Sequence, residues 1–486
     1  MAGTFVGLLS AEAVVRVFAL IASVITVRAL APAGFGAFAY ALAFAGIVGV
    51  TVDFGLSLLL IRDVSARPEQ SAPLLGSTLV AIALVGGLAF AVAAALAFTG
   101  TVTGPASSAA LLIAFGAAAS DAVSLAFEAT LTGHGRAGLL PLVRAARGTA
   151  LVCAVAVATL WHPTPEGFLG ASLAGSLLGA GTAAAACALR AVRPKFAGAV
   201  RRVLPLLRRA LPFALLAASY LLYSRIDLVM LGLIDGRHAA GQYGVATRVL
   251  ETALLVPIYF GSAFLATISH GVGGRLATPP TPQRTARALR ASLLIGAPCS
   301  FGLALAGPWL VDLVAGPGYG SAGELLARLS PVIALVACYG VLSNLQLALD
   351  RTATLVAIVA GGALVKIAGN ALLIPAYGAR GAAATAVGVE TLVVLAQWTA
   401  ARRQLAGTGM PSWAARLAAA VGAMVAAGIA LLSGVGAPWP VALAAGLAAF
   451  GLVGAAGGSI SGAELRAAGS AITQAKRHGD SGPAET

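Results

Sequence analysis

The chain has 486 residues, of which 59% are hydrophobic and only 10% are charged. Soluble domains are about 45–50% apolar and about 25% charged, so this composition excludes an ordinary water-soluble protein. The formal net charge of +14 is compatible with nucleic-acid binding, so the placement of the basic residues has to decide that question.

Long apolar runs, bounded by Gly, Pro or charged residues, follow one another along almost the whole chain. Backbone groups in lipid need partners within their own segment, so runs of about 20 apolar residues predict transmembrane helices. The predicted fold class is therefore an all-α polytopic membrane protein. Fourteen spans are predicted, at residues 5–29, 35–61, 74–99, 107–132, 141–161, 168–190, 211–234, 242–270, 291–314, 325–349, 353–374, 381–401, 412–433 and 439–459.

Basic residues indicate which helix ends face the cytoplasm, because Lys and Arg concentrate in cytoplasmic loops. With the N-terminus inside, most of the 31 Lys and Arg lie in cytoplasmic loops, at cytoplasmic span ends or in the C-terminal tail. The external loops hold only Arg28, Arg237 and Arg380. We therefore predict a multi-pass protein of the cytoplasmic (inner) cell membrane with both termini in the cytoplasm. The net charge then reflects topology, and nucleic acid is not a predicted partner.

The longest basic stretch, residues 193–209, lies between the sixth and seventh spans. Its Lys and Arg alternate with apolar side chains such as Phe196, Val200 and Leu204. This pattern favours a helix lying on an anionic leaflet over a solvated linker, so anionic membrane lipids are a predicted partner. The predicted domains are a six-helix bundle (1–192), this basic linker helix (193–210), a second six-helix bundle (211–403), two additional transmembrane helices (404–459) and a disordered cytoplasmic tail (460–486).

Two short strings recur in the two predicted bundles. The string Gly-Ala-Phe-Ala-Tyr-Ala at 36–41 opens the second span, and Gly-Gln-Tyr-Gly-Val-Ala at 241–246 opens the eighth. Gly135-Arg136 and Asp350-Arg351 mark cytoplasmic turns at equivalent places. Six spans separate the copies, and an even number gives both halves the same orientation. This predicts a parallel repeat about an axis normal to the membrane.

Several segments resemble polysaccharide-export flippases. Residues 28–38, R-A-L-A-P-A-G-F-G-A-F, resemble their R-x-L-G-P-x-x-F-G-x-Y segment, although Ala31 stands where many relatives have Gly. Residues 53–62 resemble their D-F-G-L…R second helix, and residues 227–248 resemble their seventh-to-eighth helix junction. The most specific segment is N-A-L-L-I-P-A-Y-G-A-R-G-A-A at 370–383, which is similar to N-x-x-L-I-P-x-x-G-x-x-G-A-A.

The resemblance covers roughly residues 5–400 in the right order and is to the lipid-linked oligosaccharide flippases and polysaccharide transporters of the multidrug/oligosaccharidyl-lipid/polysaccharide (MOP) exporter superfamily. It implies two six-helix bundles in a V around a central cavity, with two optional further helices. It also implies flipping of a polyprenyl-pyrophosphate-linked oligosaccharide to the external leaflet by alternating access, alongside a polysaccharide polymerase or glycosyltransferases. Lipid II flippases share the two extra helices, so that substrate stays open.

Ionisable residues within spans are costly to insert and usually face a wet cavity or a partner. Four cations come from both predicted halves, and Arg suits phosphate oxygens because its planar fork donates twice. The predicted substrate-binding residues are Arg16, Arg225, Arg248, Lys366 and Asn370. The predicted ion-coupling or cavity-pairing residues are Glu12, Asp121, Glu128, Asp227, Glu251 and Glu390. The alternative for each residue is a structural pair such as Glu12 with Arg16 or Arg248 with Glu251, both at helical spacing.

Other functions fit the residues less well. A multidrug exporter would favour a carboxylate-dominated aromatic cavity, whereas this set is rich in cations and only 6% of the chain is aromatic. A glycosyltransferase or glycan polymerase would need catalytic groups in a sizeable loop. A scaffold would leave the buried cations without a role. No Ser-His-Asp order and no metal-ligand spacing stands out, so we predict a non-enzyme without metal or cofactor. No ATP motif stands out either, so we predict coupling to an H⁺ or Na⁺ gradient.

Overall fold

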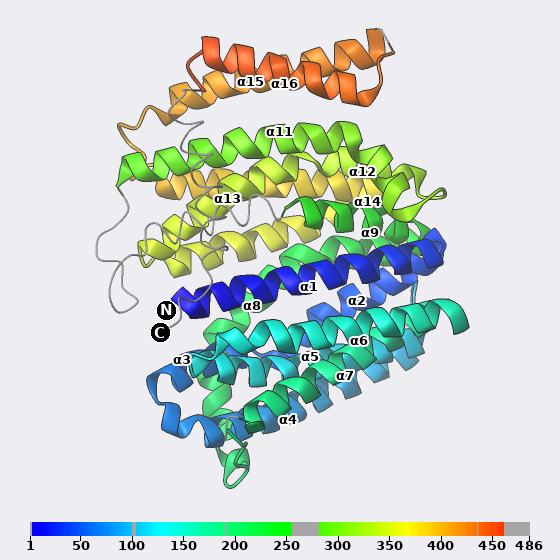
Figure 1. The fold of residues 1–486 in the computed structure, drawn as a ribbon, viewed down its shortest axis with the longest axis vertical. Helices are drawn as coiled ribbons and strands as arrows, with labels where there is room; N and C mark the ends of the chain where they lie inside the picture. The colour runs from blue at the N-terminus through cyan, green and yellow to red at the C-terminus, as the bar shows by residue number, and fades with distance from the viewer. Residues whose placement is uncertain (1, 100–103, 190–191, 255–280, 435, 461–486) are drawn as a thin grey trace, which may run out of the picture. The chain divides into compact units, whose positions relative to one another are not determined.

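The computed structural model describes residues 2–99, 104–189, 192–254, 281–434 and 436–460. For residues 2–13, Ala97, Leu216 and Gly434 it describes the backbone alone. In these ranges the regular secondary structure is helical, with no strand (Figure 1). Eleven helical stretches in the described ranges are long and apolar enough to cross a membrane. The predicted all-α polytopic membrane fold is therefore confirmed, while the count of fourteen spans stays a prediction.

The described chain divides into two compact units. The first comprises residues 1–245, 312–319 and 363–382, and the second comprises 246–311, 320–362 and 383–486. Discontinuous segments thus contribute to each unit. The predicted domain limits and the parallel repeat stay predictions.

The first unit is a bundle of long helices. The helices α5 and α6 both pack against α7, and α2 packs against α5 and α8. Its core includes the fully buried side chains of Leu59, Leu75 and Phe115. Its elements are α1 (Ala2–Ala29), α2 (Pro32–Asp53), α3 (Leu56–Ala66), η1 (Pro68–Gln70), α4 (Ser71–Phe98), α5 (Ser108–Gly133), η2 (Ala137–Leu139), α6 (Leu140–Trp161), α7 (Pro165–Leu189), α8 (Ala199–Ile234) and the first part of α9 (Gly236–Ala253).

The second predicted span, 35–61, contains a break that the hydrophobic pattern does not reveal. Phe54 and Gly55 adopt left-handed backbone angles, with φ of 47° and 68°, and separate α2 from α3. Asp53 accepts hydrogen bonds from the backbone N–H of Ser57 at 3.3 Å and from its hydroxyl at 3.0 Å. The Asp-Phe-Gly string is therefore a helix break whose carboxylate satisfies the start of α3.

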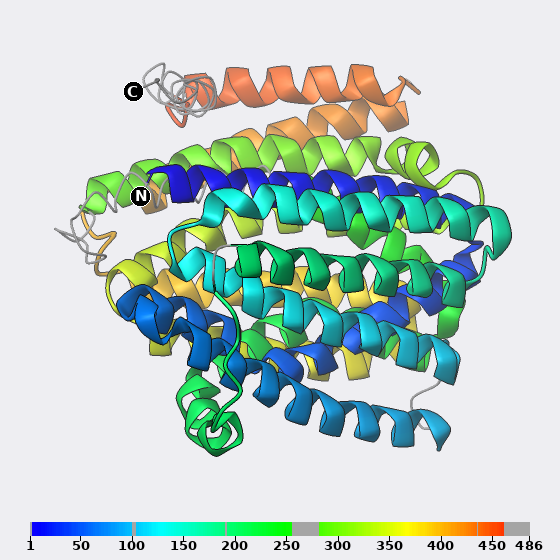
Figure 2. The same ribbon diagram turned by 60° about the horizontal axis from the view of Figure 1, so that its bottom comes forward.

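The predicted linker helix and the seventh predicted span form one helix, α8, which has Pro205 and Pro212 inside it. Its first turns, residues 199–211, are called the α8 arm below. The arm runs across the direction of α4 and α5 in both views (Figures 1 and 2). Pro205 and Pro212 have no backbone N–H, so each removes one intrahelical hydrogen bond from α8.

The second unit holds the C-terminal helices. Trp413 on α15 is 1% exposed, donates to the Ser459 carbonyl at 2.9 Å and lies 5.6 Å below the Arg290 guanidinium. Phe301 of α11 packs between Gly428 and Gly446, which joins α15 and α16 to α11. Its elements are α11 (Pro282–Ala315), α12 (Gly320–Leu329), α13 (Pro331–Ala348), α14 (Thr352–Ala401), α15 (Met410–Ile429), η3 (Ala430–Gly434) and α16 (Trp439–Ala456), and parts of α11 and α14 belong to the first unit.

The 50-residue α14 is two antiparallel helices rather than one rod. A straight helix of that length would extend about 75 Å, whereas the hydrocarbon core of a bilayer is about 30 Å thick. Gly378 has non-helical angles (φ 55°, ψ −136°), and Arg351 at one end donates to the carbonyl of Ala400 at the other at 3.3 Å. The chain therefore reverses between the predicted spans 353–374 and 381–401.

Candidate functional site

A buried polar cluster in the first unit surrounds Asp227 of α8. Its Oδ2 atom lies 2.7 Å from the Lys366 ammonium and accepts from the Tyr243 hydroxyl at 3.1 Å. Its Oδ1 atom accepts from the Asn370 amide at 2.8 Å. Lys366 and Asn370 lie one turn apart on α14, so that their side chains emerge from the same face of that helix. Three of the predicted site residues thus meet at one point.

The Lys366 ammonium has a second set of contacts on α8. It donates to the Tyr223 carbonyl at 2.9 Å and lies 4.8 Å from the centre of the Tyr223 ring. The side chains of Lys366 and Asp227 are 8% and 7% exposed. An ion pair this buried needs a full set of partners to offset its desolvation, and here the carboxylate, a carbonyl and a ring face provide them. The cluster can therefore hold α8 and α14 together without a ligand.

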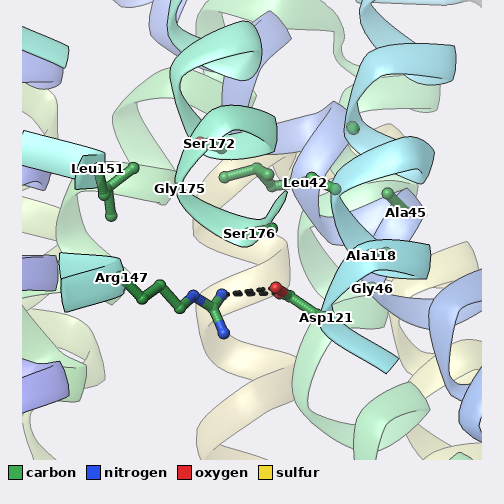
Figure 3. A pocket seen from close by; sticks show the side chains of 12 residues that line it. Leu42, Ala45, Gly46, Ala118, Asp121, Arg147, Leu151, Ser172, Gly175 and Ser176 are labelled. Carbon is green, nitrogen blue, oxygen red and sulfur yellow. Dashed lines mark hydrogen bonds and ion pairs between the residues drawn. The ribbon is translucent and has the colours of Figure 1, made fainter. Parts of the chain in front are cut away.

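A second pair of charges lies beside a cavity of about 240 Å³ within the first unit. The helices α5 and α6 pack on α7 but leave room between them, and Arg147 of α6 reaches Asp121 of α5 across this space (Figure 3). One terminal nitrogen of Arg147 lies 2.8 Å from both carboxylate oxygens and donates a hydrogen bond to Oδ2. Ser172 and Ser176 of α7 also line the cavity, among small apolar residues.

The Asp121–Arg147 pair is accessible. The Asp121 side chain is 35% exposed and that of Arg147 is 33% exposed. The structure gives the Nε and the second terminal nitrogen of Arg147 no further partner in the described ranges. Ser176 is 3% exposed, and its hydroxyl makes no hydrogen bond to a described residue. The cavity thus offers uncommitted donors next to the Asp121 carboxylate.

About two turns further along α5, Glu128 forms a more buried pair. Its Oε2 atom accepts from Arg144 Nε at 2.9 Å, and its Oε1 atom accepts from the Ser124 hydroxyl at 3.2 Å. The Glu128 side chain is 6% exposed and that of Arg144 is 20% exposed. This pair is enclosed by protein, unlike the Asp121 pair.

The remaining predicted residues are dispersed. Arg16 of α1 is exposed and Arg225 of α8 is partly exposed. In the second unit, Arg248 and Glu251 form a loose pair at 3.5 Å, and Glu390 of α14 is 7% exposed. The side chain of Glu12 lies outside the described residues, so its predicted pair with Arg16 stays a prediction.

Sequence reasoning missed Arg144 and Arg147 as members of the site, because it assigned both to topological charge. For Arg144 the signal was the symmetry of a helical hairpin, whereas Asp121 and Arg147 are 15 and 11 residues from Arg136 and do not follow it. Glu128 and Arg144 are each eight residues from Arg136, at the turn between α5 and α6. Residues equidistant from a tight turn between antiparallel helices lie at the same height, which predicts their pairing. Tyr223 and Tyr243, the other unforeseen members, had no such signal.

Three comparisons with known proteins bear on this arrangement. Residues 2–270, more than half of the chain, match the family described as polysaccharide biosynthesis protein. A comparison with curated proteins finds no match. Among solved structures, the lipid II flippase MurJ in an inward closed conformation has a TM-score of 0.72 at 13% identity, with 91% of this chain and 96% of that chain covered.

Two other solved structures share the fold. An inward-facing multidrug resistance MATE family transporter of the MOP superfamily has a TM-score of 0.63 at 15% identity, over 81% of this chain and 95% of that one. A MOP superfamily transporter from Pyrococcus furiosus has a TM-score of 0.55 at 14% identity, over 83% and 94%. At these identities the likeness concerns the fold. The chain belongs to the polysaccharide biosynthesis protein family, and its fold is that of the MOP superfamily transporters.

Proposed function

We propose that this protein is a flippase that carries a polyprenyl-pyrophosphate-linked oligosaccharide from the cytoplasmic to the external leaflet by alternating access, without chemical change to the glycan. The match to the polysaccharide biosynthesis family over residues 2–270 carries the proposal. The few ionisable residues within the predicted spans support it, because such residues need a wet path or a charged partner. Cell-surface polysaccharide assembly in the cytoplasmic membrane is the proposed setting.

Among the predicted substrate-binding residues, Arg16 and Arg225 are assigned to the headgroup. Both residues carry a guanidinium group and lie in the first unit, Arg16 on α1 and Arg225 on α8. Both are at least partly exposed. A pyrophosphate carries about two negative charges and is well matched by the planar fork of Arg. Lys366 and Asn370 instead hold Asp227, which makes them positioning residues for α8 and α14. Arg248 lies 3.5 Å from Glu251, is partly exposed, and is the third headgroup candidate.

The test is flipping in proteoliposomes, normalised to the amount of reconstituted protein. We expect Arg16→Gln and Arg225→Gln each to slow transfer of a polyprenyl-pyrophosphate oligosaccharide at least about tenfold, since hydrogen bonds to charged groups contribute about 1.5–3 kcal/mol. Arg16→Lys should keep part of the rate, because Lys retains the charge but loses the fork. Arg328→Gln is the matched control, since Arg328 forms an exposed pair with Glu324 within one helix. Rates equal to that of the control would contradict the assignment.

Lipid II is the second candidate substrate, because the MurJ structure covers 91% of this chain. Both lipids present a polyprenyl pyrophosphate, so the arginine variants do not separate them. Offering the two lipids and a cationic dye to the same proteoliposomes does. Faster transfer of lipid II than of any oligosaccharide lipid would favour the peptidoglycan precursor, and transfer of the dye alone would favour a multidrug exporter.

The energy source is proposed to be an ion gradient, with Asp121 as the responsive carboxylate. Protonation of Asp121, or a cation beside it, would weaken its contact with Arg147 and change how α5 and α6 are bridged across the cavity. We expect a proton gradient across the proteoliposome membrane to accelerate flipping by the native chain and to leave Asp121→Asn unaffected. An equal response of both proteins would contradict this role. A response to Na⁺ without a pH gradient would identify the other ion.

A further inference from the structure

The α8 arm presents three distinct faces. The side chains of Val203, Leu206 and Ala210 are buried against the core formed with α3 and α4. At about 100° per residue, these positions share one side of the helix. The arm is therefore packed on the first unit along its length and is not a free linker.

Two polar contacts fix the arm in place. Arg209 forms an ion pair with Asp63 of α3 at 2.8 Å. Just before the arm, the backbone N–H of Lys195 donates to the Ala72 carbonyl at the start of α4 at 2.9 Å. Because α4 runs along the direction of the spans and the arm runs across it, the arm lies in the plane of the membrane (Figures 1 and 2).

A second face of the arm is apolar and exposed. Val200 is 70% exposed, Leu204 58% and Leu211 46%, and Phe196 just before the arm is 56% exposed. At helical spacing the three arm residues lie within about 40° of one another, next to the buried face. Such a contiguous apolar stripe is unfavourable in water and suits the boundary between headgroups and acyl chains.

The third face is basic. Arg201 and Arg208 lie about 80–100° from Val200 around the helix, and Arg202 lies further round. All three are exposed, and they form no ion pair with any described residue. Counting Lys195 and Arg209 as well, and subtracting Asp63, the segment carries a net charge of +4. The positive charge and the apolar stripe are side by side, as in helices that lie on anionic membranes.

We propose that the α8 arm is a binding surface for anionic phospholipids, with Leu204 and its neighbours among the upper acyl chains and Arg201, Arg202 and Arg208 at the phosphates. The occupant is the lipid leaflet rather than an acidic protein, because the stripe next to the charges is aliphatic and the arm lies in the membrane plane. This inference goes beyond the proposed function and does not depend on what the protein transports.

The test measures which lipid lies beside Leu204. In a chain whose four cysteines are replaced by Ala, Leu204→Cys carries a fluorophore and the protein is placed in lipid nanodiscs. Quenching is compared for two spin-labelled lipids that share acyl chains and differ only in headgroup, phosphatidylglycerol or phosphatidylcholine. We expect both to quench, with a preference for phosphatidylglycerol of about fivefold at low salt. Leu88→Cys, at a 68% exposed position on α4 far from any charge in sequence, should show equal quenching by both.

Two further measurements identify the source of the preference for phosphatidylglycerol. The triple variant Arg201→Gln, Arg202→Gln, Arg208→Gln should lose the preference for phosphatidylglycerol. The protein with its native arginines should also lose this preference in 1 M salt, because the screening length there is about 3 Å. Arg209 stays unchanged because it holds Asp63. Equal quenching by the two lipids at low salt would overturn the proposal. So would a preference that survives the triple substitution, or a fluorophore that neither lipid quenches, which would indicate that water or a protein covers the face.

Discussion

Asp227 is a negative charge held at 7% exposure by three donors that come from two other helices. In water each of these groups would be solvated, so the cluster is stable only while its charges cancel. That balance explains why a chain with few charged residues keeps both an Asp and a Lys inside its spans. It also makes the contribution of each residue measurable, because a pair behaves differently from its members.

We predict that Lys366→Met and Asp227→Asn each destabilise the protein by about 3–5 kcal/mol, since each leaves an uncompensated buried group. The double variant should regain much of this loss, because no charge is left unpaired. Thermal unfolding in detergent and abundance in the membrane measure both effects. Removing the exposed Arg328–Glu324 pair in the same way should change stability by about 1 kcal/mol or less. Single variants as stable as this control would show that the pair is dispensable.

The two carboxylates of α5 allow a matched comparison at nearly constant geometry. Glu128 is 6% exposed in its pair and Asp121 is 35% exposed beside the cavity. Glu128→Gln should therefore lower the unfolding temperature clearly more than Asp121→Asn, because water can solvate Arg147 but reaches Arg144 less well. The same two variants should rank in the opposite order for loss of ion-driven flipping. Equal stability losses would mean that the cavity is closed to water.

At the scale of elements, the two recurring glycine strings turn out to touch each other. A methyl group at Gly36 of α2 would overlap the Arg237 carbonyl, and one at Gly241 of α9 would overlap the Pro32 carbonyl. Both residues belong to the first unit, so this is a close crossing of α2 and α9. The strings singled out as evidence of a repeat therefore have a packing role, in which glycine allows two backbones to approach.

Gly36→Ala and Gly241→Ala should each destabilise the first unit by about 1–3 kcal/mol, because backbone atoms cannot yield as a flexible side chain does. Gly181→Ala on α7 is the control, since a methyl group there would meet nothing within 4 Å. Unfolding temperature and membrane abundance are the measurements. Variants at 36 and 241 that behave like the one at 181 would show that the crossing is loose enough to open.

Hydrophobic pattern located the helices well where one run makes one helix. Residues 107–132 and 141–161 were predicted, and the structure has Ser108–Gly133 and Leu140–Trp161. It did not locate the break at Phe54 and Gly55, because lipid selects for apolar residues on both sides of a kink. The sequence also singled out Asp227, Lys366 and Asn370 as polar residues within spans. It did not show that they contact one another, because contacts between residues about 140 positions apart leave no periodic signal in the sequence.

Orientation is a property of the whole molecule, and the distribution of Lys and Arg predicts it. In a chain without its four cysteines, Pro163→Cys, between α6 and α7, should react with an impermeant thiol reagent in intact cells. Glu69→Cys in η1, at an exposed position, should react only after the membrane is permeabilised. The permeabilised sample controls for intrinsic reactivity. Reversed labelling would invert the predicted topology and, with it, the proposed direction of flipping.

Transport by the whole molecule should respond to membrane potential if the headgroup keeps its charge while it crosses. An inside-negative potential drives anions outward with roughly 2.3 kcal/mol per charge per 100 mV, and a pyrophosphate headgroup of about two charges gains roughly twice that. We therefore expect outward flipping in proteoliposomes to slow when valinomycin and matched potassium collapse the potential. Vesicles without protein give the baseline leak. A rate that does not change with potential would mean that co-moving cations neutralise the headgroup. The gradient of those cations, rather than the membrane potential, would then drive flipping.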